Sequence, residues 1–223
     1  MPILTKRTNK TSLGIYIHVP FCRSKCQYCD FYSLTTKDDK LIDGYLDAVC
    51  DHIRETGPLA PGYQVDTVYF GGGTPSFFGA DGMAAILTAV RRAFDVSTDA
   101  EITFEANPDD ITTHLIDVLM SEGVNRISLG IQSFNDSQLK LLRRRHSATQ
   151  AQEAIQIIHS KGIPHISIDL IYGQPYQTLA SWKDDLTKAL SQPIDHLSAY
   201  ALSVEDSTPL QRMLKEKKLA LPS

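Results

Sequence analysis

The sequence predicts an α/β protein built on a parallel sheet. Short apolar or β-branched runs alternate with amphipathic helical patterns along the chain, and six of these runs read as strands: residues 15–19, 65–70, 101–105, 126–130, 165–170 and 196–202. Repeated strand–helix–strand units demand parallel pairing, because each crossover helix returns the chain to the same end of the sheet. A complete eight-unit barrel usually takes about 250 residues. Periodicity in this chain of 223 residues therefore leaves two architectures open, a doubly wound open sheet and a partial barrel.

The helical segments carry their own start and stop signals. Apolar side chains recur at three- and four-residue steps over residues 41–53, which indicates an amphipathic helix. Ser147 and Gln150 form a capping box at the start of a second helix over residues 148–160. Gly162 supplies the left-handed residue that ends it.

Composition excludes several classes of protein. The chain is 42% hydrophobic and 22% charged, which is ordinary for a globular domain. Its formal charge of −4 lacks the basic excess typical of nucleic-acid binders, so we expect no nucleic-acid partner. No apolar stretch approaches the roughly 20 residues that cross a bilayer, so no transmembrane segment is expected. Residues 1–12 read as a polar tail without a secretion signal and residues 13–223 as one domain, which predicts a cytoplasmic protein.

Three of the four cysteines, Cys22, Cys26 and Cys29, lie within eight residues, just after the first predicted strand. This spacing lets three thiolates converge on one centre from a single loop. Structural zinc normally needs four protein ligands, and no second Cys/His pair at zinc-finger spacing follows. Three thiolates suit an iron–sulfur cluster with one iron left open for a substrate or cofactor. A zinc-stabilised barrel remains the alternative.

The residues around the cysteines suggest further properties. Arg23 and Lys25 are expected to lower the pKa values of the neighbouring thiols, since nearby cations favour the thiolate. Cys50 lies on the helix predicted over residues 41–53 and borders its apolar stripe, so we expect it to be a small buried core residue.

Other candidate residues follow the predicted strands, where parallel α/β proteins gather their chemistry. The glycines before Thr74 would let a ligand approach the backbone. Glu105 ends a strand with a carboxylate that can accept hydrogen bonds from sugar hydroxyls. Asp169 interrupts an apolar strand, which is costly unless the carboxylate has a partner. In the run of three arginines around Arg144, one side chain turned inward could bind a carboxylate.

The Cys22-x3-Cys26-x2-Cys29 motif, with Tyr28 before its last cysteine, resembles the signature of the radical S-adenosylmethionine (SAM) superfamily. Its flanking residues 16–21, Tyr-Ile-His-Val-Pro-Phe, are similar to the oxygen-independent coproporphyrinogen III oxidase family. The resemblance runs from about residue 13 to the end of the chain. It implies a partial (βα)6 TIM-like barrel of the radical SAM type.

The resemblance also implies cofactors and their ligands. A [4Fe-4S] cluster would be held by the three clustered cysteines, and an electron donor protein would reduce it so that SAM is cleaved to methionine and a 5′-deoxyadenosyl radical. The residues expected to contact SAM are Tyr16, Tyr28, Gly72, Gly73, Thr74 and Glu105. Three more, Gln132, Arg144 and Asp169, match positions that bind a second SAM in the family.

Within that family, the residues after the third cysteine point to one branch. The oxidases carry a fourth cysteine where this chain has Phe31, and Asp30 replaces a glycine. Both features resemble the HemW-type branch, whose members bind heme and deliver it to heme-dependent proteins. The alternative is the oxidase activity, in which two propionates of a porphyrinogen are decarboxylated to vinyl groups. Heme or a porphyrinogen, an electron donor and heme-recipient proteins are the expected partners. The family's C-terminal domain is expected to be absent here, so no heme ligand is assigned.

Overall fold

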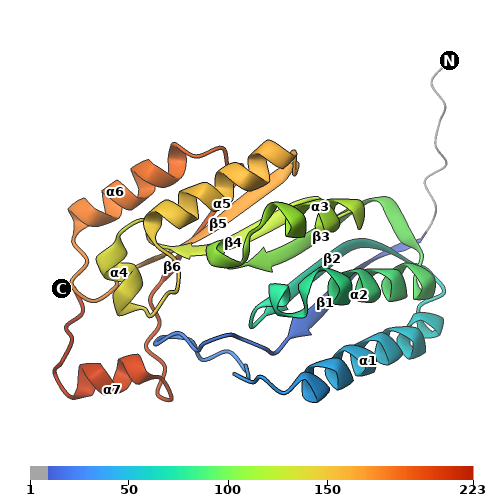
Figure 1. Cartoon of the computed structure of the whole chain (residues 1–223), viewed down its shortest axis with the longest axis horizontal. Coiled ribbons are helices and arrows are strands. Elements are labelled where there is room, and N and C mark those ends of the chain that lie inside the picture. The colour runs from blue at the N-terminus through green and yellow to red at the C-terminus, as the bar shows by residue number, and fades with distance from the viewer. Residues whose placement is uncertain (1–9, 223) are drawn as a thin grey trace.

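A single parallel sheet organises the computed structural model, which describes residues 10–222. Its six strands lie in sequence order, each beside its successor (Figure 1). The strands are β1 (Thr11–Val19), β2 (Tyr63–Gly72), β3 (Val96–Ala106), β4 (Arg126–Gln132), β5 (His165–Tyr172) and β6 (His196–Ala201). All six predicted strands are therefore confirmed, with ends that differ by a few residues.

The strand order decides between the two architectures that periodicity leaves open. A doubly wound sheet reverses its strand order at a switch point. Here the order β1-β2-β3-β4-β5-β6 never reverses, and within the described residues β1 and β6 have no pairing with each other. The sheet is thus a curled half-barrel, as the expected partial TIM-like barrel requires.

Helices connect successive strands and cover the sheet (Figure 1). They are α1 (Asp39–Thr56), α2 (Gly79–Ala93), α3 (Thr113–Ser121), α4 (Asp136–Leu141), α5 (Ala148–Lys161), α6 (Leu179–Leu190) and α7 (Pro209–Lys215). The predicted capping box is present at the start of α5, where Ser147 and Gln150 bond each other's backbone N–H groups. Gly162 ends α5 with φ +86°, as predicted. The part of the chain that the structure describes has no helix both long and apolar enough to cross a membrane.

The hydrophobic core lies between the strands and their helices. Phe70 and Phe104 on neighbouring strands pack with ring centroids 6.5 Å apart, and both are fully buried. Cys50 on α1 is buried in the same cluster, which confirms its expected structural role. Burial of these side chains fixes the helices against the outer face of the sheet and leaves the strand ends free to form a site.

One boundary and the position of one residue differ from the prediction. β1 begins at Thr11, before the expected domain start at residue 13, because residues 11–13 pair with β2 ahead of a register shift between Leu13 and Gly14. Residues 1–9 of the expected tail lie outside the described residues. Asp169 lies inside β5, opposite Ser198 of β6, and not at the strand's end.

The segment that follows β6 returns to the loop that carries the clustered cysteines. The backbone N–H of Leu210 in α7 donates to the carbonyl of Gln27 at 3.0 Å, and Leu210 is fully buried. The Ser207 hydroxyl also bonds the Asp30 carboxylate. Residues from the two ends of the sequence therefore meet beside this loop, at the lower left of Figure 1.

Candidate functional site

A cavity of about 600 Å³ opens at the carboxyl ends of the strands, between the cysteine loop and β2 to β6. Eleven of the twelve residues expected from the sequence line it: Cys22, Tyr28, Cys26, Cys29, Gly72, Gly73, Thr74, Glu105, Gln132, Arg144 and Asp169. The remaining one, Tyr16, is not part of the lining. The fold thus brings residues from six separate segments to one place.

The cysteine loop is fixed at its base by backbone and aromatic contacts. Cys22 N–H donates to the Leu34 carbonyl at 3.0 Å, and Leu34 N–H donates to the Pro20 carbonyl at 2.6 Å. Phe21 is buried and stacks on Phe77, with ring centroids 5.4 Å apart. The loop tip that carries the thiols therefore projects from an anchored base.

The glycine-rich turn after β2 packs directly against this loop. Gly73 N–H donates to the Val19 carbonyl at 2.7 Å. A Cβ at Gly73 would lie 2.6 Å from the Phe21 carbonyl oxygen and 3.0 Å from Cys22 Sγ. Gly72 has φ +107°, and a Cβ there would meet the His18 ring at 2.6 Å. Gly73 leaves no room for a side chain because two backbone segments approach there, whereas Gly72 is favoured by its positive φ and by the adjacent His18 ring.

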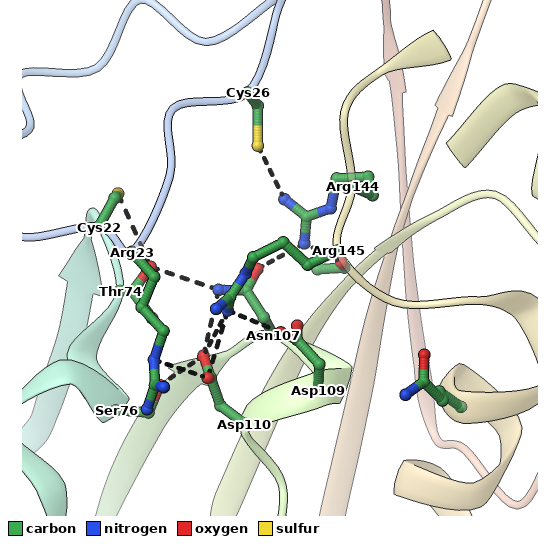
Figure 2. A network of polar contacts seen from close by, with 12 residues as sticks. Cys22, Arg23, Cys26, Thr74, Ser76, Asn107, Asp109, Asp110, Arg144 and Arg145 are labelled. Carbon is green, nitrogen blue, oxygen red and sulfur yellow. Dashed lines mark hydrogen bonds and ion pairs between the residues drawn. The ribbon is translucent and has the colours of Figure 1, made fainter. Parts of the chain in front are cut away.

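Two of the three clustered cysteine sulfurs, those of Cys22 and Cys26, each have a hydrogen-bond donor beside them. The Thr74 hydroxyl points at Cys22 Sγ, 3.7 Å away. The Arg144 guanidinium donates from Nη1 to Cys26 Sγ at 3.3 Å, while Nη2 donates to the Gly130 carbonyl and to Asn107 Oδ1 (Figure 2). One arginine of the run is thus turned inward, as anticipated, whereas Arg143 is exposed. The Nε of Arg144 is buried and has no hydrogen-bond partner among the described residues.

Asp110 joins the elements around the cysteines (Figure 2). Its side chain is only 3% exposed, and it accepts hydrogen bonds from Ser76 at 2.9 Å and from Asn107 at 3.4 Å. The same carboxylate forms ion pairs with Arg23 at 3.4 Å and Arg145 at 3.2 Å. Asp110 therefore connects the cysteine loop, the glycine-rich turn, the end of β3 and the segment before α5.

The cysteines are free thiols, and all three are partly exposed toward the cavity. Burial raises the pKa of Cys29, and the neighbouring cysteines add to this effect, while Lys25 contributes only a small lowering. The expectation that nearby cations lower the thiol pKa values is therefore wrong for Cys29, because desolvation outweighs the cation. Deprotonation would then come with metal binding itself.

The donor set fits an iron–sulfur cluster better than a single ion. Within residues 10–222, no group of three His, Cys, Asp or Glu side chains is arranged to hold one metal ion, so the zinc alternative gains no support. In a cluster each thiolate binds a different iron, so the three cysteines need only line the same cavity and need not converge on a single ion. The buried donor on Arg144 and the Thr74 hydroxyl match the negative charge of such a group.

Two carboxylates face the cavity from β3 and β5. Glu105 accepts a hydrogen bond from the Tyr69 hydroxyl at 2.6 Å, and burial raises the pKa of its carboxyl despite that bond. Asp169 accepts from Ser128 at 3.5 Å and from Ser198, and burial likewise raises the pKa of its carboxyl. Glu105 thus lies where hydroxyl groups of a bound ligand could donate hydrogen bonds to it. The hydrogen bonds to Asp169 compensate for the burial of its carboxylate within the apolar strand β5.

Tyr16 on β1 is the one candidate that is not part of this lining. It is exposed, stacks on Tyr69 at 6.0 Å, and its hydroxyl is 3.1 Å from His18 Nδ1. Tyr16 therefore stands behind the lining, next to Tyr69, which bonds Glu105, and next to His18, whose ring abuts Gly72.

Sequence reasoning missed the residues that hold the site together. Asn107, Asp109 and Asp110 follow β3 and looked like an ordinary polar turn, and Tyr69 looked like a strand residue. The signal that could have found them is position, since Asn107 directly follows a strand that ends at the cavity.

Comparison with known proteins decides the family. The radical SAM superfamily profile matches residues 16–189, most of the described barrel. The chain belongs to the radical SAM superfamily. It is 36% identical over 211 residues to the heme chaperone HemW of Lactococcus lactis and 34% identical over 207 residues to the oxygen-independent coproporphyrinogen III oxidase of Bradyrhizobium diazoefficiens. These matches cover 93% and 92% of this chain, but 54% and 46% of the relatives.

A solved structure shows the same fold. Coproporphyrinogen III oxidase HemN from Escherichia coli, a radical SAM enzyme, superposes with a TM-score of 0.85 at 30% identity. The match covers 98% of this chain and 50% of the oxidase. The radical SAM chain therefore spans about half the length of these relatives.

Proposed function

We propose that this chain is the radical SAM part of a HemW-type heme chaperone, which holds a [4Fe-4S] cluster, SAM and heme and delivers heme to a recipient protein. The observation that carries the proposal is the convergence of Cys22, Cys26 and Cys29 on one cavity, followed by Phe31 where the resemblance puts the oxidases' fourth cysteine. Curated HemW proteins from six bacterial species share 33–39% identity with the chain.

The proposed cofactors divide the cavity between them. The three cysteines would hold the cluster, which supplies the electron for reductive cleavage of SAM. Gly72 and Gly73 line the cavity, where their backbone would receive the SAM amino group, and Glu105, held in place by Tyr69, would accept hydrogen bonds from the ribose. Gln132 and Asp169 lie farther round the sheet, where the proposed second SAM or the tetrapyrrole would lie.

Two exposed aromatic side chains support a planar apolar ligand. Phe31 is 66% exposed and Tyr200 is 56% exposed, and both line the cavity. Exposed aromatic rings at a cavity mouth provide apolar surface on which a tetrapyrrole can stack. They come from opposite ends of the barrel, the cysteine loop and β6, so a ligand between them would bridge the open side.

The second candidate is the oxidase activity, which the HemN structure and the oxidase relative favour. Anaerobically reconstituted chain is titrated with hemin while the Soret band is followed, and a parallel sample receives SAM, dithionite and coproporphyrinogen III. We expect hemin binding with no protoporphyrinogen formed. Protoporphyrinogen would replace the chaperone proposal by the oxidase, and failure to bind hemin would remove heme from the functions of this chain.

A variant pair locates the heme. Phe31→Ala should weaken hemin binding several-fold, because the ligand loses a stacking surface worth about 1 kcal/mol. Tyr63→Ala is the matched control, since Tyr63 is also an exposed aromatic but begins β2 at the far end of the strand. Equal affinity in both variants would show that heme binds elsewhere.

A further inference from the structure

We propose that Arg144 sets the reduction potential of the cluster through an N–H···S hydrogen bond to Cys26. This inference rests on the proposed function, because it concerns the cluster that the cysteines would hold. It assigns Arg144 a role toward the metal centre, in addition to the SAM contact that the resemblance implies.

The geometry ties the guanidinium to the cysteine loop. Nη1 lies 3.3 Å from Cys26 Sγ, and the Gly130 carbonyl accepts from Nη2 at 2.6 Å. Asn107 Oδ1 accepts from Nη2 as well. Both terminal nitrogens of Arg144 therefore have partners in the protein. The two acceptors bound to Nη2 orient the guanidinium so that Nη1 faces Cys26 Sγ (Figure 2).

Asn107 acts on Arg144 as a positioning residue. Its Oδ1 accepts from the guanidinium, while its Nδ2 donates to Thr74 at 3.3 Å and to Asp110 at 3.4 Å. Thr74 in turn points at Cys22 Sγ. The Asn107 side chain therefore links Arg144, which donates to Cys26 Sγ, with Thr74, which points at Cys22 Sγ.

The electrostatic consequence has a definite sign. A reduced cluster carries one more negative charge than an oxidised one, so a cationic donor on a ligand sulfur stabilises the reduced form more. Hydrogen bonds to cluster sulfurs are one of the main ways in which a protein tunes the potential. Loss of the Arg144 donor should thus make the cluster harder to reduce.

The test is an anaerobic redox titration of reconstituted chain without SAM, followed by electron paramagnetic resonance. We expect Arg144→Gln to reduce the equilibrium constant for reduction about tenfold, which is about 59 mV toward negative potential for one electron. Arg143→Gln is the charge-matched control, because the adjacent Arg143 is exposed and also lines the cavity, yet within residues 10–222 it has no hydrogen bond to a cysteine sulfur. It should move the potential by less than half as much.

Asn107→Ala keeps the charge and removes the positioning acceptor, so it should shift the potential in the same direction by a smaller amount. This variant carries the test if Arg144→Gln fails to take up iron. An unchanged potential in the iron-loaded variants would overturn the inference, and so would an equal shift in Arg143→Gln. Failure of the unmodified chain to assemble a cluster would contradict the proposed function instead.

Discussion

Gly73 is the residue at which the site is most tightly packed. Its backbone lies between the Val19 and Phe21 carbonyls, and the nearest sulfur is that of Cys22. Neither carbonyl can rotate away, because both belong to the base of the cysteine loop. The identity of this one residue therefore controls how closely the glycine-rich turn and the cysteine loop approach.

Gly73→Ala should separate the two segments. We expect a loss of roughly 1–3 kcal/mol in the free energy of unfolding, as overpacking generally costs, and lower iron uptake on reconstitution. Gly44→Ala is the control, because Gly44 lies within α1 with nothing within 4 Å of its added Cβ. That change should stabilise the chain by about 0.5–1 kcal/mol. Urea denaturation and iron analysis measure both, and equal stability in the two variants would contradict the packing argument.

The cysteines differ in what each contributes. Replacing Cys22, Cys26 or Cys29 by Ala should abolish the brown absorbance of the cluster, since each would bind a separate iron. Cys50→Ala should leave iron content unchanged, because Cys50 is buried in the core around α1. Iron and sulfide analysis after anaerobic reconstitution checks both results. A full cluster in any of the first three variants would refute the ligand assignment.

Glu105 is expected to serve SAM and not the cluster. Glu105→Ala should weaken SAM binding about tenfold or more, as loss of hydrogen bonds to a charged acceptor usually does, while iron content is retained. Calorimetric titration of SAM into the reconstituted chain measures this. Glu101→Ala is the control, because Glu101 is an exposed glutamate on the same strand. Similar SAM affinities in the two variants would remove Glu105 from the site.

At the scale of elements, the segment between α4 and α5 is held to β4 by a buried histidine. His146 Nε2 lies 3.0 Å from the Ile131 carbonyl and its Nδ1 has no partner, which indicates a neutral ring that donates from Nε2. Burial lowers the pKa of His146 to about 4, and the adjacent Arg144 contributes to the lowering. This histidine is therefore neutral in the folded chain at neutral pH.

Acid should weaken the fold through this residue. Between about pH 6.5 and 4 the unfolded chain binds a proton at His146 that the folded chain does not, so the free energy of unfolding falls as the pH falls. Over this whole pH range the free energy of unfolding should fall by about 3 kcal/mol. His146→Gln should flatten this dependence, whereas the exposed His52→Gln should not. Urea denaturation at several pH values measures it, and equal slopes in the two variants would contradict this origin.

Elements were predictable to the extent that their signals are local. The capping box at Ser147 and the left-handed Gly162 lie next to the helix they bound, and the cysteine spacing lies within one loop. The contacts of Asp110 were not predictable, because its partners come from residues 23, 76 and 145 and meet only after the barrel curls. The same holds for Arg144, whose sequence neighbours are equally basic and yet exposed.

At the scale of the whole molecule, the half-barrel is open along one side, between β1 and β6. The described chain partly bridges this side at the cavity mouth, where Leu210 and Ser207 contact the cysteine loop. An open barrel gives a large planar ligand lateral access to the cavity, which a closed eight-stranded barrel would obstruct. We expect the tetrapyrrole of the proposed function to enter the cavity from this side.

The central claim is that three thiols hold a cluster whose fourth iron is open to SAM. Electron paramagnetic resonance of anaerobically reconstituted, dithionite-reduced chain tests it most directly, with spectra recorded before and after SAM is added. The account predicts a reduced four-iron signal whose g-values shift when SAM binds. A chain that gives no such signal, or a signal that SAM leaves unaltered, would contradict it.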